Sequence, residues 1–172
     1  MKKNRNTTKP NFITKYYFNF IYNLILKEIL EKKIVLDFGS GYGFLKNIAM
    51  KKKIDSKIIN YDKISSLSEI KNWKKVNFDM IIFCQSIYLI NQKNIIKIFK
   101  EIKKRKKKII IISVFSNQTF LNKLFSIILG HKNAHNQTKT SPWIEEKLLK
   151  KYFSLVKAKN YILFKMIVLI NN

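Results

Sequence analysis

The chain has 172 residues, of which 47% are hydrophobic and 13% aromatic. This composition fits one folded domain and excludes a largely disordered protein. No stretch reaches the roughly 18 consecutive apolar residues of a membrane helix, and no apolar signal core follows the basic first residues, so we expect neither a membrane span nor a secretory signal. The single cysteine, Cys84, excludes an internal disulfide and a multi-cysteine zinc site. It favours a cytoplasmic location, and we expect no metal.

The chain is strongly basic, because its 35 lysine and arginine residues and 10 acidic residues give a net charge of +25. Such a balance favours anionic partners, either nucleic acid or an anionic membrane surface. However, Arg5 and Arg105 are the only arginines, whereas nucleic-acid surfaces tend to use arginine. Lysine also has A/T-rich codons, as do the abundant Ile, Asn, Phe and Tyr, so genomic base composition is the slightly favoured interpretation of much of the lysine. We therefore rank nucleic acid below a small-molecule partner and keep a peripheral membrane contact as an option.

Residues 1–32 are predicted to form a tail and one amphipathic helix, ahead of a single folded domain at 33–172. Apolar residues recur at helical spacing within 11–31. The face expected to pack on the sheet consists of Phe12, Tyr16, Phe20, Leu24 and Ile25.

Apolar runs then alternate with helical patterns along the chain. The expected strands are 33–38, 58–62, 78–83 and 108–115, followed by a closing pair at 153–158 and 161–170. The expected helices are 42–52, 91–104, 118–129 and 142–151. This alternation predicts an α/β protein with a mainly parallel sheet covered by helices on both faces. The closing pair predicts an antiparallel hairpin at one edge.

Three of the four glycines, Gly39, Gly41 and Gly43, lie within five residues of one another. They follow the apolar run 34–36, in the stretch Ile-Val-Leu-Asp-Phe-Gly-Ser-Gly-Tyr-Gly. Glycine tolerates positive φ and has no Cβ, so the cluster marks a sharp turn or a ligand lying against the backbone. A strand, a glycine loop and a helix form the nucleotide sites of open α/β sheets. Phe44 occupies the position where a dinucleotide fingerprint requires glycine, and no P-loop lysine follows.

The stretch resembles motif I of the class I S-adenosylmethionine-dependent methyltransferases, which reads apolar-apolar-Asp-x-Gly-x-Gly-x-Gly. It matches that motif at Asp37 and at all three glycines. The resemblance implies a Rossmann-like fold, S-adenosylmethionine as cofactor and in-line methyl transfer to a small molecule, including sugar- or lipid-linked acceptors. It implies that Asp37 orders the site beneath the methionine part of the cofactor, which lies against Ser40 and the glycines. An RNA or protein methyltransferase and a non-catalytic cofactor-binding scaffold remain alternatives.

Two polar residues lie at the ends of the next two predicted strands. Asp62 lies 19 residues after Gly43, where the family uses an acid to bind the ribose of the cofactor, as dinucleotide sites do. Capping of the next helix is the alternative role for Asp62. The stretch 78–90 resembles motif IV of the family, which implies that Gln85 lies near the transferred methyl group.

The segment between Asp62 and Asp79 departs from the family, because only 16 residues separate the two. The family places a helix, a strand and an adenine-contacting acid there. We therefore expect a shortened helix and a third strand that is reduced or absent. Glu69 is a candidate for the adenine-contacting acid, and Ile64 for one wall of the adenine slot.

The only histidines, His131 and His135, lie in a predicted polar loop at 130–142. A histidine titrates near neutral pH and could accept a proton from an acceptor hydroxyl, so both are candidate catalytic bases. Exposed loop histidines without a role are the alternative. The apolar stretch 120–129 could touch a membrane or shelter a lipidic acceptor, but core packing is the favoured interpretation.

Overall fold

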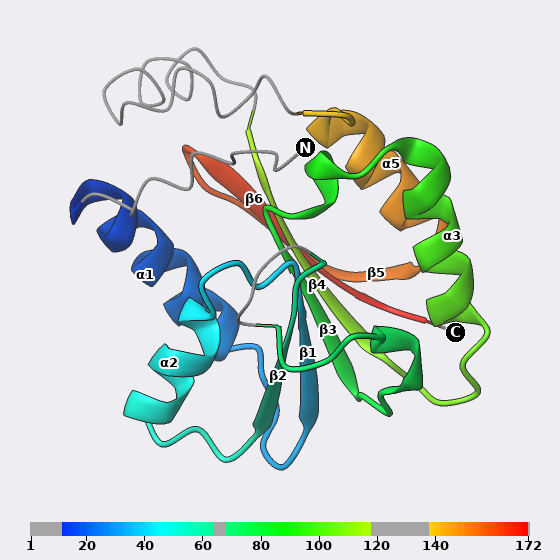
Figure 1. Ribbon diagram of the computed structural model, residues 1–172. Coiled ribbons are helices and arrows are strands. Elements are labelled where there is room, and N and C mark those ends of the chain that lie inside the picture. Colours follow the sequence, from blue (N-terminus) through cyan, green and yellow to red (C-terminus); the bar gives the residue numbers. More distant parts are fainter. Residues whose placement is uncertain (1–11, 64–67, 118–137, 172) are drawn as a thin grey trace, which may run out of the picture.

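The computed structural model describes residues 12–63, 68–117 and 138–171. These residues form a six-stranded sheet with helices on both of its faces (Figure 1). The strands are β1 (Ile34–Phe38), β2 (Lys57–Tyr61), β3 (Met80–Cys84), β4 (Ile110–Ser116), β5 (Ser154–Asn160) and β6 (Phe164–Ile170). The helices are α1 (Phe12–Leu26), α2 (Phe44–Lys51), α3 (Gln92–Lys103) and α5 (Pro142–Tyr152), with short 3₁₀ helices η1 (Trp73–Lys75) and η2 (Ile87–Leu89).

The strand order is β2-β1-β3-β4-β6-β5. The first four strands in this order are parallel, whereas β6 runs antiparallel to both β4 and β5. The predicted mainly parallel sheet with a C-terminal antiparallel hairpin is therefore confirmed. The helix predicted at 118–129 lies outside the described residues.

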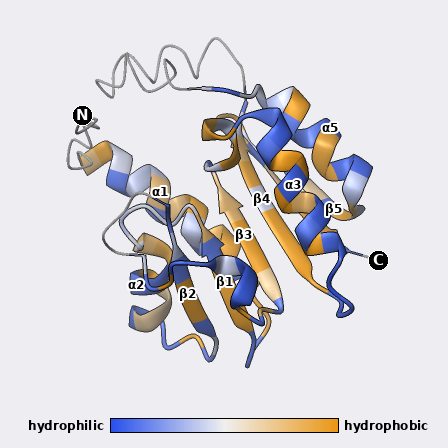
Figure 2. Cartoon of the chain, turned by 45° about the vertical axis from the view of Figure 1, so that its right-hand side comes forward, coloured by the Kyte–Doolittle hydropathy of each residue, from blue (hydrophilic) through white to orange (hydrophobic). Residues whose placement is uncertain are grey.

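Two hydrophobic clusters fill the space on the two faces of the sheet. One lies beneath α3 and α5 and includes Phe99 and Leu149. The other lies beneath α1 and α2 and includes Ile25 and Leu45. The central strand β3 is buried along its whole length, and Figure 2 shows the central strands in hydrophobic colours. Burial on both faces explains why the central strands read as continuous apolar runs in the sequence.

The inner face of α1 differs from the prediction. Phe12, Tyr16 and Phe20 were expected to face the sheet, but they are 83%, 71% and 47% exposed. The sheet is instead covered by a neighbouring stripe that includes Ile21 and Ile25. Apolar spacing could not select the inner face, because this helix is apolar on almost every side. An apolar outer surface on α1 is the result.

The segment between β2 and β3 contains no strand within its described residues, 68–79, and forms only η1. Glu69 lies beside the outer edge of β2, where its N–H donates to Asn60 O at 3.0 Å and its Oε2 accepts from Asn60 N at 3.2 Å. The Oε1 atom of Glu69 pairs with Lys46. Each carboxylate oxygen thus has a partner at the sheet edge, and a contact of Glu69 with adenine stays a prediction.

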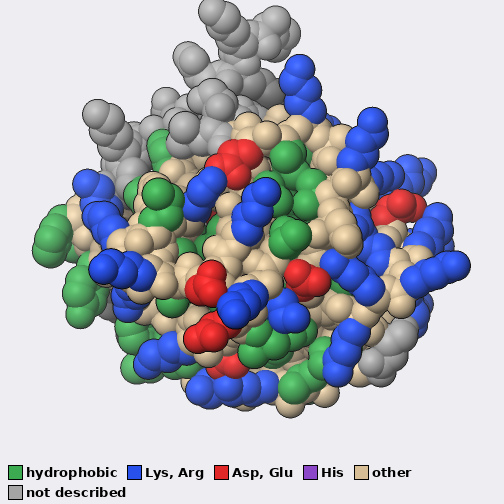
Figure 3. All heavy atoms as spheres, turned by 90° about the horizontal axis from the view of Figure 1, so that it is seen from below, with side chains coloured by type: hydrophobic (Ala, Val, Ile, Leu, Met, Phe, Trp, Pro, Cys, Tyr) green, Lys and Arg blue, Asp and Glu red, His purple; other side chains and the backbone are tan. Residues whose placement is uncertain are grey.

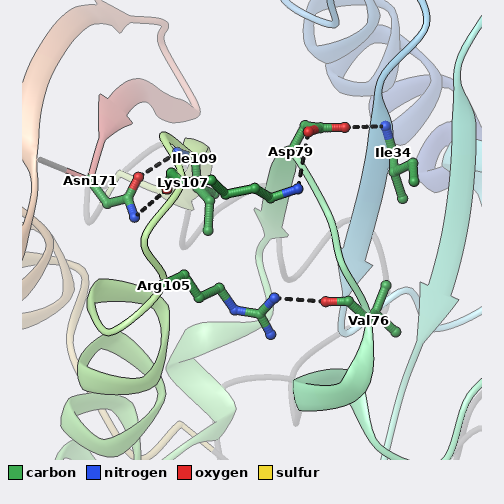
Figure 4. Close-up of polar contacts among 7 residues, drawn as sticks. All are labelled: Ile34, Val76, Asp79, Arg105, Lys107, Ile109 and Asn171. Atoms are coloured by element: carbon green, nitrogen blue, oxygen red, sulfur yellow. Dashed lines mark hydrogen bonds and ion pairs between the residues drawn. The ribbon is translucent and has the colours of Figure 1, made fainter.

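Polar side chains join the strands at the opposite edge of the sheet, where the parallel strands begin (Figure 4). Asp79 accepts from Ile34 N at 2.9 Å and pairs with Lys107 Nζ at 3.1 Å. The backbone bond from Ile34, followed by the bond from Lys107, lowers the pKa of Asp79. Asn171 Oδ1 accepts from Ile109 N, so the last described residue is also tied to the sheet.

Arg105 fixes the segment that precedes β3. Its guanidinium donates to Val76 O at 2.7 Å and to Lys74 O at 2.9 Å, and lies 4.2 Å from the centroid of the Phe78 ring. The only arginine among the described residues therefore has a structural role. It stabilises a loop at the place where the family has a further strand and where we expected that strand to be reduced or absent.

Candidate active site

The glycine loop joins β1 to α2 at the edge where the parallel strands end (Figure 1). All three glycines have positive φ, with values of +81° at Gly39, +52° at Gly41 and +68° at Gly43. A Cβ atom at Gly39 would overlap the Ser86 side chain, and one at Gly43 would lie 2.7 Å from Asn60 Nδ2. Packing therefore requires glycine at position 39, whereas at position 43 the close atom is the end of the Asn60 side chain and the positive φ is the stronger constraint.

Gly41 has different surroundings, because apart from Gly41 itself and its two chain neighbours no heavy atom of the described chain lies within 4 Å of the position that its Cβ would take. Its backbone N–H donates to Asp62 Oδ2 at 3.1 Å. The Gly41 amide thus holds the Asp62 carboxylate, which follows β2, beside the open space above the glycine loop. The structure brings together two residues that are 21 positions apart in the sequence, as parallel neighbouring strands require.

Asp37 lies beneath this loop at the end of β1 and is 2% exposed. Within the described chain its Oδ2 atom is buried without a hydrogen-bond partner, and so is the hydroxyl of Ser40. Burial, together with the nearby Asp62 carboxylate, raises the pKa of Asp37 to about 7. Unsatisfied buried polar atoms are costly, and two of them under an open glycine loop fit a site that is completed by a bound ligand.

Gln85 follows β3 directly and has a φ of +49°. A side chain in this left-handed region costs on the order of 1 kcal/mol or more. The backbone N–H of Gln85 donates to Val114 O at 2.8 Å, and its Nε2 donates to Tyr17 Oη at 2.7 Å. Gln85 is thereby held at the predicted edge, and α1 is connected to the site through Tyr17.

Sequence reasoning missed Tyr17 and Asn60. Asn60 is buried on β2 directly beneath the glycine loop, and its Oδ1 has no hydrogen-bond partner within the described chain. A polar residue at a buried, alternating position of a strand could have been recognised from the period of two. Tyr17 offered no such signal, because its partner lies 68 residues away in the sequence.

Known proteins resemble this chain in fold but not in sequence. The sequence matches no protein-family profile and no curated protein. In structure, a SAM-dependent methyltransferase from Methanosarcina mazei is similar with a TM-score of 0.56, over 86% of this chain and 96% of that chain, at 16% identity. This chain has the fold of the class I S-adenosylmethionine-dependent methyltransferases.

Two further solved methyltransferases show the breadth of this likeness. Magnesium protoporphyrin IX methyltransferase from Synechocystis, with bound S-adenosylhomocysteine, has a TM-score of 0.55 at 12% identity and covers 94% of this chain and 88% of its own. The N-methyltransferase NodS from Bradyrhizobium japonicum has a TM-score of 0.59 at 10% identity and covers 91% and 97%. The methyltransferase fold is thus shared by enzymes with different acceptors, so the fold does not identify an acceptor for this chain.

All residues that we predicted to bind the cofactor lie at one edge of the sheet, either in a strand or in the loop that follows it. They are Asp37, Gly39, Ser40, Gly41, Gly43, Asp62 and Gln85. The predicted catalytic residues His131 and His135, and the candidate adenine wall Ile64, lie outside the described residues. Their roles remain predictions.

Proposed function

We propose that this protein is an enzyme that binds S-adenosylmethionine at the glycine loop and methylates a small-molecule acceptor. The observation that carries the proposal is the pairing of an open backbone at Gly41 with the buried, unpartnered carboxylate oxygen of Asp37. The cofactor carries a positive sulfonium, an ammonium group and ribose hydroxyls. Buried acceptors and a carboxylate beside open backbone fit such a ligand.

The residues divide the binding task between them. Asp37 and Ser40 would hold the methionine part, and Asp62 would accept bonds from the ribose. Gln85 would border the methyl group. When bound, the cofactor supplies an electrophilic methyl group.

The protein has to place the acceptor in line with that methyl group and exclude water, and orientation alone can supply on the order of 7–11 kcal/mol. A base is required only for a protonated acceptor. We propose His135 or His131 for that role. We also place the enzyme in the cytoplasm, since its one cysteine, Cys84, is buried and free.

Calorimetric titration with S-adenosylhomocysteine tests the site, and Gly41→Gln is the sharpest variant. Gln85 has nearly the same φ as Gly41, 49° against 52°, so glutamine can adopt this backbone conformation. We expect the variant to fold and to lose affinity by at least about 100-fold, because its side chain fills the open space above the loop.

Lys53→Gln is the matched control, because Lys53 has a φ of 55° in the turn after α2. We expect wild-type affinity from it. Equal affinity of the Gly41→Gln variant and this control would remove the glycine loop from the site.

A cofactor-binding scaffold is the second candidate, because 68–79 forms no strand and the adenine side of the site is therefore reduced. Binding of S-adenosylhomocysteine without turnover on any small acceptor would favour the scaffold. An RNA methyltransferase would instead show RNA binding that weakens steeply with salt.

A further inference from the structure

We propose that the edge of the sheet that carries the site docks on an anionic membrane surface. The docking face consists of exposed apolar side chains from three elements that reach this edge in Figure 1: the start of α1, the turn between β5 and β6, and the start of α5. Among the described residues, no helix combines the length and apolar character of a membrane span. The contact that we infer is therefore peripheral.

The outer surface of α1 supplies the largest part of the docking face. Phe12, Ile13, Tyr16 and Phe20 are 83%, 48%, 71% and 47% exposed, and lie on successive turns of one helix. Lys15 is the only charged residue of α1. A helix that is apolar on nearly all sides requires cover on its outer side as well. Phenylalanine and tyrosine beside a lysine are typical of helices that lie in a lipid interface.

The turn between β5 and β6 extends this surface. The Phe20 ring lies 6.2 Å from the Tyr161 ring, centroid to centroid, which places α1 against the turn. The next residue, Ile162, is 72% exposed. At the start of α5, Trp143 is 68% exposed, and Lys147 Nζ lies 5.1 Å from its ring centroid. Tryptophan next to lysine is another combination found at membrane interfaces.

The charges at this edge complement anionic lipid. None of the ten acids lies in α1 or in 154–171. Asp37 and Asp62 belong to the site, Glu145 is buried, and Glu146 pairs with Lys150 and Lys165. Exposed lysines near the docking face are Lys15, Lys139, Lys147 and Lys159.

The opposite edge has a different surface. Figure 3, which views the molecule from that side, shows acidic side chains scattered among the lysines. The ion pairs of Lys107 with Asp79 and of Lys104 with Glu101 belong to this end of the molecule. Mixed charge of this kind favours neither a bilayer nor a nucleic acid, so the site edge is the better candidate for docking.

The docking face and the site lie at the same edge of the sheet, because Tyr17 of α1 is hydrogen-bonded to Gln85 of the site. Docking in this orientation would therefore turn the glycine loop and Gln85 toward the lipid surface. It would give the enzyme access to an acceptor that resides at a membrane. The docking itself does not depend on cofactor binding, so it can be tested separately from the proposed methyl transfer.

The test is cosedimentation of the full chain with phosphatidylcholine vesicles that contain about 30% phosphatidylglycerol, and with vesicles of phosphatidylcholine alone. We expect binding to the anionic vesicles that weakens with salt. The double variant Phe12→Ser/Tyr16→Ser should lower the partition coefficient by at least about tenfold. Its circular dichroism and its affinity for S-adenosylhomocysteine should equal those of the wild type.

Met50→Ser is the matched control, since Met50 is 68% exposed, like Trp143, but lies in the last turn of α2. It should bind vesicles as the wild type does. Equal vesicle binding by the double variant and the control would overturn the proposal. Failure of the wild type to bind the anionic vesicles would overturn it as well. Binding of generic RNA in place of vesicles would then make this surface a nucleic-acid site. A dimer that the double variant converts to a monomer would make it an interface between two copies of the chain.

Discussion

Replacement of Asp37 by asparagine should stabilise the free protein above neutral pH and weaken its binding of the cofactor. The folded protein raises the pKa of this buried carboxyl from 3.8 to about 7. Between about pH 4 and about pH 7, Asp37 of the folded protein therefore keeps a proton that the same residue of the unfolded chain has released. The free energy of unfolding consequently falls as the pH rises from about 4 to about 7, and stays low above that. At about 1.4 kcal/mol per pH unit, the loss amounts to about 4 kcal/mol. An asparagine side chain cannot ionise, so the free energy of unfolding of the variant should not fall in this way as the pH rises.

Urea unfolding followed by circular dichroism between about pH 5 and pH 9 measures the effect. The wild type should lose stability as pH rises, and Asp37→Asn should flatten that slope and be the more stable protein at high pH. The same variant should bind S-adenosylhomocysteine at least about tenfold more weakly, because a buried acceptor for the ligand is changed.

Glu145→Gln is the matched control for this experiment. Glu145 is a second buried carboxyl, bonded to Ser113 on β4 at 3.0 Å, and burial raises its pKa from 4.5 to about 8. Its replacement should also flatten the pH dependence of stability, but cofactor affinity should stay at the wild-type level. A wild type whose stability does not change over this range, or an Asp37→Asn variant with full cofactor affinity, would refute the reasoning.

Two further predictions concern the edges of the sheet. Asp62→Asn keeps an oxygen for the Gly41 N–H but removes a charged acceptor, so S-adenosylhomocysteine binding should weaken by about 1–3 kcal/mol; an unchanged dissociation constant in calorimetry would exclude a ribose contact. Arg105→Ala removes two hydrogen bonds to backbone carbonyls and the contact with Phe78, and should lower the free energy of unfolding by about 2–3 kcal/mol in urea. Lys106→Ala, which changes an exposed neighbour, should have little effect, and equal losses in the two variants would contradict the structural role of Arg105.

Local features of the sequence were sufficient for much of the site. The glycines of the loop predicted a strand, a turn and a helix, because positive φ and close packing against Ser86 and Asn60 leave few alternatives to glycine. The buried runs at β3 and β4 predicted a sheet covered on both faces. Asp62 and Gln85 could be assigned to one edge because parallel strands end at the same side of a sheet.

The sequence by itself determined the order of the elements, the glycine loop and the edge at which the polar residues meet, since each follows from local conformation or from the direction of parallel strands. Only the tertiary structure decided which face of α1 is buried, because that helix is apolar on both sides and the choice depends on the shape of the sheet beneath it. It also decided that Tyr17 bonds to Gln85, across 68 residues of sequence. Such contacts depend on packing between distant segments, for which no local spacing carries a signal.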